Sequence, residues 1–159
     1  MSFVRFLSRS RNALVRAARP TFARRAFSGD AAVRPAVTSF SEDEEMLRQA
    51  VEQFSNTTLR PHVAQMDRDS HMPREVLDAL FDNGLMGIEM PEKWGGSDAS
   101  FTSAILTIEE LAKVDPSVSV LVDIQNTLLN NMFKFWASPE LQDQWCPRLT
   151  TDTLSLIHI

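Results

Sequence analysis

The sequence predicts an all-α domain, a bundle of about five to six helices, and two observations lead to this fold class. Apolar residues recur at helical spacing in several segments, and these segments begin at serine or aspartate residues suited to cap a helix. No segment alternates polar and apolar residues with the period of a strand, and no hairpin signal is present. The helical part, of about 110 residues, is long enough to bury a core.

The first helix is predicted to begin after Ser41. The Ser41 hydroxyl can cap the first amides, and Glu44, three residues later, completes a capping box. This explains the acidic run 42–45 better than metal binding does, because acids also suit the positive start of a helix. Apolar residues follow at helical spacing: Leu47, Ala50, Val51 and Phe54. Pro61 should end or kink this helix, and residues 62–70 can continue it.

The second helix is predicted to start at Pro73, a residue suited to the first helical position, and to stop at Gly84 as a left-handed cap. Residues 91–96, Pro-Glu-Lys-Trp-Gly-Gly, are typical of a loop. The two glycines, Gly95 and Gly96, favour a tight turn over a phosphate loop, which would need further glycines and a following lysine.

A third helix should follow a cap at Ser100 or Asp98. Its inward residues are expected to be Phe101, Ile105, Ile108, Leu111 and Ala112. A fourth, of about 20 residues, should start at Asp115-Pro116 and end near Trp136. Its apolar surface is unusually broad, which predicts the central helix of the bundle.

A fifth helix is expected to start at Ser138-Pro139, which repeats the pattern of a cap followed by proline. Pro147 should limit its length, because proline removes a helical hydrogen bond.

Charge divides the chain into two parts. Residues 1–27 hold seven arginines and no acid, whereas the remainder holds nine basic and 21 acidic residues, giving +7 and −12. The overall charge of −5 argues against a nucleic-acid partner. No apolar run is long enough for a transmembrane segment, and the single cysteine cannot form an internal disulfide.

The arginine-rich start is typical of a mitochondrial transit peptide. On a helical projection Arg5, Arg9 and Arg16 fall on one side and apolar residues on the other. Residues 25–28, Arg-Ala-Phe-Ser, resemble a matrix-protease site, so we expect cleavage after Phe27 and localisation in the mitochondrial matrix. Residues 28–39 are then expected to form a linker.

The residues by themselves indicate no catalytic, cofactor or metal site. The histidines, His62, His71 and His158, lack partners at metal-ligand spacing, and a solvated turn explains Asp67, Asp69 and His71 better. Adjacent helical positions do not face each other, so Glu109 and Glu110 cannot act as a pair. Cys146 is expected to be a buried thiol. Amides on the fourth helix, such as Asn126 and Asn130, should satisfy backbone groups, or some could approach a ligand.

Several stretches resemble the N-terminal helical domain of the acyl-CoA dehydrogenase family. They are residues 83–89 (Asn-Gly-Leu-Met-Gly-Ile-Glu), the loop 91–96, and the helix 107–115 (Thr-Ile-Glu-Glu-Leu-Ala-Lys-Val-Asp). Residues 99–101 and 123–128 are similar to members that act on short or branched acyl chains. The resemblance implies a domain over residues 40–153, whereas residues 154–159 depart from it and are expected to be an aberrant tail.

In this family a glutamate removes the α-proton of an acyl-CoA substrate and FAD accepts the β-hydride, giving 2-enoyl-CoA in fatty-acid and branched-chain amino-acid catabolism. The resemblance implies a homotetramer that passes electrons to electron-transferring flavoprotein. It also implies that the glutamate and the flavin contacts lie in the middle and C-terminal domains, so no catalytic or flavin-binding residue is expected in this chain, which should be inactive alone.

The resemblance does assign one wall of the acyl pocket. The positions that match are Val120, Leu121 and Ile124, whose aliphatic side chains suit a short branched chain, although all three could equally be core. The expected function is thus the N-terminal part of an FAD-dependent acyl-CoA dehydrogenase. The alternative is a non-catalytic helical module that associates with full-length subunits.

Overall fold

The structure, a computed structural model, describes residues 39–151. Several of the expected segments lie outside the described residues. These are the transit peptide 1–27, the linker 28–39 except its last residue, the end of the expected domain, and the tail 154–159. Over residues 39–151 the chain forms five helices and no strand. Two of them are continuous through a π-helical segment. The first consists of α2 (Glu42–Phe54), η2 (Ser55–Leu59) and α3 (Arg60–Asp69). The second consists of α6 (Pro116–Asp123), η4 (Ile124–Asn130) and α7 (Asn131–Trp136).

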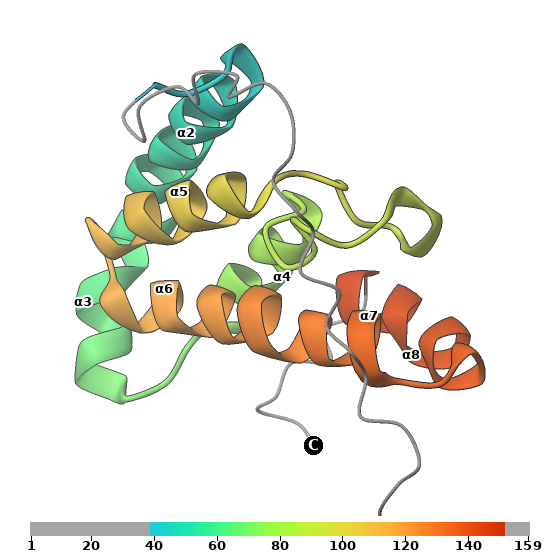
Figure 1. Ribbon diagram of the computed structural model, residues 1–159. Helices are drawn as coiled ribbons and strands as arrows, with labels where there is room; N and C mark the ends of the chain where they lie inside the picture. Colours follow the sequence, from blue (N-terminus) through green and yellow to red (C-terminus); the bar gives the residue numbers. More distant parts are fainter. Residues whose placement is uncertain (1–38, 152–159) are drawn as a thin grey trace, which may run out of the picture. The chain divides into compact units, whose positions relative to one another are not determined.

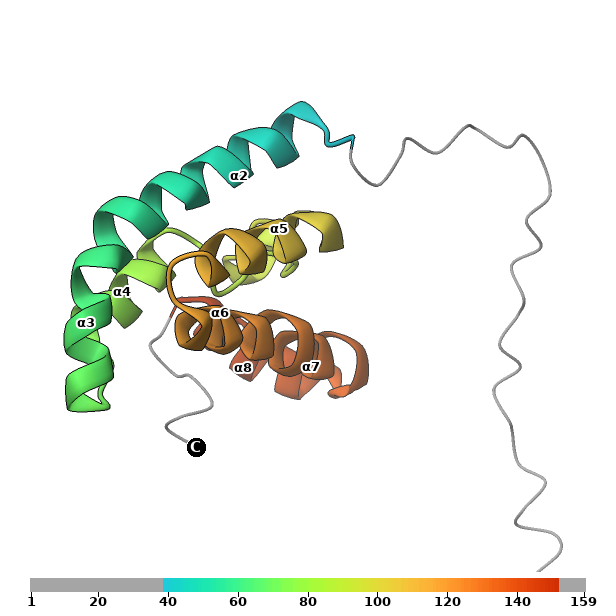
Figure 2. The ribbon, with the colours of Figure 1, turned by 90° about the vertical axis from the view of Figure 1, so that its left-hand side faces the viewer.

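The other three helices are α4 (Arg74–Asp82), α5 (Phe101–Ala112) and α8 (Pro139–Thr151). The all-α prediction is therefore confirmed for the described residues. Helix α5 lies between α2 and α6, as both views show (Figure 1, Figure 2). The expectation that the helix from Pro116 to Trp136 is central is wrong. It packs on α5 and contacts α8 and residues 85–88 with its buried side, and it leaves much of its apolar surface exposed.

The start of α2 is as predicted. The Ser41 hydroxyl accepts from the Glu44 amide at 3.2 Å, and the Glu44 carboxylate accepts from the Ser41 amide at 2.9 Å. The second carboxylate oxygen of Glu44 accepts from the Ser100 hydroxyl at 2.9 Å, and Ser100 itself caps α5. One capping box thus joins the first turns of two helices.

The interruption predicted at Pro61 takes the form of a π-helical segment. Pro61 lies directly after η2, so the π-helical segment falls just before the residue that cannot donate a helical hydrogen bond. The axis changes direction between α2 and α3 (Figure 2). Helix α3 then ends at Ser70, which has a left-handed backbone with φ 48°.

The connection between α4 and α5 follows the glycine and proline signals closely. Helix α4 begins one residue later than expected, at Arg74, with Pro73 as its cap residue, and Gly84 is left-handed with φ 70°. Residues Glu92–Trp94 form a 3-10 turn (η3), and Gly95 ends it with φ 81°. The tight turn predicted at Gly95 and Gly96 is confirmed.

The predicted inward face of α5 is wrong for most of its residues. Leu111 is buried, but Phe101 is 59% exposed, Ile105 39%, and Ala112 is also exposed. The buried positions of α5 are instead Ser103, Ala104, Leu106, Thr107, Glu110 and Leu111, of which three are small. The small side chains allow close approach of the neighbouring helices, and Leu106 and Leu111 supply buried apolar surface on the same helix.

Helix α8 continues to Thr151, so the expectation that Pro147 limits it is also wrong. Proline leaves only the carbonyl of residue 143 without its helical donor, and Asp143 is exposed to water. On the other side of α8, Cys146, Leu149 and Thr150 are buried. The packing of these three side chains offsets the missing bond.

Candidate functional site

One side of the long helix α6–η4–α7 carries exposed apolar side chains. Val120, Ile124 and Leu128, spaced four residues apart, are 53%, 37% and 61% exposed. The exposed residues continue into α7 with Met132, Phe135 and Trp136. We call these six residues the apolar face. Such a contiguous surface is unusual for a domain that works alone and is typical of a binding or docking surface.

The structure brings together two of the three residues predicted for the acyl wall. Val120 and Ile124 lie one turn apart on the apolar face. Leu121 is half-buried and packs against the main core, whose members include Val118 and Val122. Leu128 belongs to the same row, and the spacing 120, 124 and 128 was a signal that could have identified it.

The buried side of η4 carries three amide side chains. Gln125, Asn126 and Asn130 are each no more than 1% exposed. Asn126 accepts from the Ile88 amide at 2.9 Å and donates to the carbonyls of Leu85 at 2.8 Å and Val122 at 2.9 Å. The prediction that amides here satisfy backbone groups is confirmed for Asn126.

The two other amides, of Asn130 and Gln125, also bond to backbone carbonyls. Asn130 donates to the Met86 carbonyl at 2.8 Å, and Gln125 donates to the Leu149 carbonyl of α8 at 2.9 Å. The acceptor residues Met86 and Leu149, like Leu85 that accepts from Asn126, are themselves almost fully buried. The amides thus supply partners to backbone that has no access to water.

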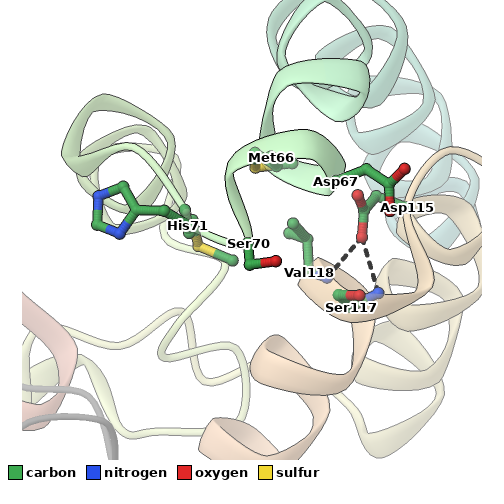
Figure 3. Close-up of a pocket in the computed structure, with 8 residues that line it drawn as sticks. Met66, Asp67, Ser70, His71, Asp115, Ser117 and Val118 are labelled. Carbon is green, nitrogen blue, oxygen red and sulfur yellow. Dashed lines mark hydrogen bonds between the residues drawn. The ribbon is translucent and has the colours of Figure 1, made fainter.

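A separate cavity of about 320 Å³ lies between the end of α3 and the start of α6 (Figure 3). Its lining includes Met66, Asp67, His71 and Asp115. The Asp115 carboxylate is already used as the helix cap, accepting from the amides of Ser117 at 2.7 Å and Val118 at 3.0 Å. None of the predicted wall residues borders this cavity.

The remaining candidate groups are structural. Glu109 is exposed while Glu110 is buried, so the two do not face each other. One oxygen of Glu110 accepts from Lys113 at 2.6 Å and Arg48 at 3.4 Å, which ties α5 to α2. Cys146 is buried, as predicted, and burial raises the pKa of its thiol.

Residues 39–151 carry neither a membrane-spanning helix nor a metal cluster. No helix there is long and apolar enough to cross a membrane. Within the same range no cluster of three or more histidine, cysteine or carboxylate side chains is arranged to hold a metal ion.

Comparison with known proteins gives a family match over most of the chain. The family model for the acyl-CoA dehydrogenase N-terminal domain matches residues 41–153. The short/branched chain specific acyl-CoA dehydrogenase of Bos taurus mitochondria is 46% identical over 121 residues, which are 76% of this chain and 28% of that protein.

Solved structures of relatives share the fold. The butyryl-CoA dehydrogenase of Megasphaera elsdenii superposes with a TM-score of 0.68 at 24% identity, over 74% of this chain and 31% of the other. A glutaryl-CoA dehydrogenase of Mycobacterium smegmatis in complex with FADH2 superposes with a TM-score of 0.66 at 25% identity, over 70% and 29%. The chain thus spans less than a third of the length of these relatives.

Proposed function

The chain belongs to the acyl-CoA dehydrogenase family, as its N-terminal domain, and on that premise we propose a function for it. It supplies the N-terminal helical domain of an FAD-dependent enzyme that oxidises short or branched acyl-CoA to 2-enoyl-CoA. The substrate class is supported by the bovine relative, whose name specifies short and branched chains. The mitochondrial matrix is the proposed location, supported by the same relative and by the arginine-rich start of the chain.

The observation that carries the proposal is the exposed row Val120, Ile124 and Leu128. An acyl chain is bound by burial, at about 0.8 kcal/mol per methylene, so its pocket needs aliphatic side chains that the domain's own core does not consume. Val120 and Ile124 meet this condition, and Leu121 lies beside them at the edge of the core. We propose these three as one wall of the acyl pocket.

The flavin is proposed to bind mainly outside the described residues. FAD carries a diphosphate, and the cavity between α3 and α6 is bordered by the carboxylates of Asp67 and Asp115, which would repel it. The cavity therefore does not fit the cofactor. We propose that the flavin and the catalytic glutamate are held by the parts of the enzyme that this chain does not span.

We also propose that the whole enzyme passes its electrons to electron-transferring flavoprotein and assembles as a homotetramer. Both are properties of a whole enzyme, and this chain corresponds to 28% of the bovine relative. The tests below therefore use a hybrid enzyme. In it, residues 41–151 of this chain replace the matching segment of the bovine relative.

The test of the function is acyl-chain selectivity in this hybrid, assayed with an artificial electron acceptor. The quantity measured is the ratio of kcat/KM for octanoyl-CoA to that for butanoyl-CoA. Ile124→Ala enlarges the proposed pocket, so we expect the ratio to rise by about tenfold. Ile105→Ala is the matched control, because Ile105 on α5 is 39% exposed against 37% for Ile124.

Turnover of the parent hybrid tests the domain assignment, and the selectivity ratio tests the acyl wall. A parent hybrid that turns over acyl-CoA supports the domain assignment, and one without turnover contradicts it. An equal change in Ile105→Ala, or no change in Ile124→Ala, removes Ile124 from the acyl wall.

A further inference from the structure

The two sides of η4 have opposite characters. Residues 125, 126 and 130 are buried amides, while Ile124 and Leu128, from the same turns, are exposed on the apolar face. The amide bonds reach backbone in two other parts of the chain, the segment 85–88 and α8. Any shift of η4 relative to these parts would break bonds on the buried side and move Ile124 and Leu128 on the other.

The π-helical geometry is needed to bring all three amides to one side. In an α-helix, at about 100° per residue, positions 125 and 130 would lie about 140° apart. A π-helical turn pairs residues five apart, which brings these two positions to the same side. In the structure Gln125 Nε2 lies 3.4 Å from Asn130 Oδ1, and both side chains face buried backbone.

Filling this space with amides costs more than filling it with apolar residues. A buried amide must find partners for every polar atom, and Gln125 Oε1 has no hydrogen-bond partner. In return, amides specify one position of the helix, because their hydrogen bonds to fixed backbone are satisfied in one arrangement only. Aliphatic packing would tolerate rotation or sliding of the helix.

We propose that Gln125, Asn126 and Asn130 act as positioning residues that set the acyl selectivity of the site. They hold η4 in its π-helical form against the segment 85–88 and α8, and thereby fix the depth at which Ile124 and Leu128 meet the acyl chain. None of the three touches the substrate. The inference rests on the proposed function, since it concerns the wall that this function assigns to Val120, Leu121 and Ile124.

The test uses the hybrid enzyme and the same selectivity ratio. Asn126→Asp keeps the acceptor for the Ile88 amide but removes the donors to Leu85 and Val122. Asn130→Ala removes the bond to the Met86 carbonyl and the acceptor for Gln125. A ratio of two substrates on one sample is independent of how much enzyme has folded. Loss of stability alone therefore leaves the ratio unchanged, whereas a displaced wall changes it.

We expect at least a fivefold change in the ratio, about what a small displacement of a binding wall produces, for both variants. Asn131→Ala is the matched control, because Asn131 follows on the same helix but donates only within it, to the Thr127 carbonyl at 3.2 Å. It should leave the ratio unchanged. Asn130→Ala provides the result if Asn126→Asp does not fold.

The outcomes separate the two levels of the proposal. Normal parent turnover with an unchanged ratio in Asn126→Asp and Asn130→Ala, even with reduced yield, overturns the positioning role alone. A change of equal size in Asn131→Ala also overturns it. A parent hybrid without turnover overturns the proposed function and this inference with it.

Discussion

At the residue scale, the loop after Met90 depends on a position where only glycine fits. The amides of Asp98 and Ala99 donate to the carbonyls of Met90 and Ile88, both at 2.9 Å, which draws the loop back onto the segment before it. A Cβ built on Gly96 would overlap with the Met90 carbonyl oxygen. Gly96 is thus required by close approach of two backbones.

We predict that Gly96→Ala destabilises the protein by about 2–3 kcal/mol, because backbone atoms must move apart to admit the methyl group. Gly84→Ala is the comparison. Its Cβ would meet only Ser97 Oγ, at 3.5 Å, so it should cost only the left-handed conformation, about 1–2 kcal/mol. Urea unfolding of both variants measures the difference. A larger loss in Gly84→Ala would contradict this account of the loop.

Single residues with local partners were the part of the fold that the sequence predicted well. The caps at Ser41, Ser100 and Asp115 and the left-handed Gly84 depend on atoms within a few residues, so their type and spacing suffice. Asn126 is different, because its partners Leu85 and Ile88 are about 40 residues away in sequence. Sequence could indicate that such an amide finds backbone partners, but not which backbone.

At the element scale, the first turn of α2 is stabilised by ionised side chains. The Glu45 carboxylate accepts from both Nη2 and Nε of Arg48, at 2.6 Å and 3.0 Å, and from Gln49 at 3.0 Å. The bonds from Arg48 and Gln49 lower the pKa of Glu45 to about 2. The backbone amide of Ser41, followed by the Ser100 hydroxyl, also lowers the pKa of Glu44.

We predict a pH-dependent stability difference between the wild type and Glu45→Gln. Because the pKa of Glu45 is lower in the folded than in the unfolded state, its contribution is fully present above about pH 4.5. It should fade as the pH falls to about 2, where the folded state also takes up the proton. Urea midpoints measured from neutral pH to about pH 2 should converge for the two proteins.

The control for this prediction is the same comparison in an Arg48→Gln background. Removal of Arg48 takes away the main cause of the lowered pKa, so the pH dependence of the difference should become much smaller. A difference that stays constant over the whole pH range in the wild-type background would show that Glu45 does not titrate as described.

The two prolines inside helical runs show what limits prediction of elements. Pro61 and Pro147 have the same local chemistry, yet the chain changes direction near the first and continues through the second. The difference lies in tertiary packing, since Cys146 and Leu149 hold α8 against the domain on both sides of Pro147. The prediction of the inward face of α5 failed for the same reason, because packing against α2 and α6 decides which of its residues are buried.

At the scale of the whole molecule, the apolar face of α6–η4–α7 is left uncovered by the described residues. Sequence predicted a broad apolar surface here, but it could not say which part is core. Val118, Val122 and Leu129 are buried, whereas Val120, Ile124 and Leu128 remain exposed. The apolar surface is broad because one side of the helix packs into the core and the other side carries exposed aliphatic residues.

We predict that this face makes the purified chain self-associate. The double variant Val120→Glu/Leu128→Glu should shift it toward monomer in sedimentation velocity, because two charges would have to be buried in the association. Its free energy of unfolding should change by no more than about 0.5 kcal/mol, as for other surface substitutions. Val122→Glu, on the same helix but fully buried, is the control and should lose more than about 3 kcal/mol.

If the double variant associates as strongly as the wild type, another surface drives the association. If it unfolds as readily as Val122→Glu, Val120 and Leu128 belong to the core and the acyl wall has to be sought elsewhere.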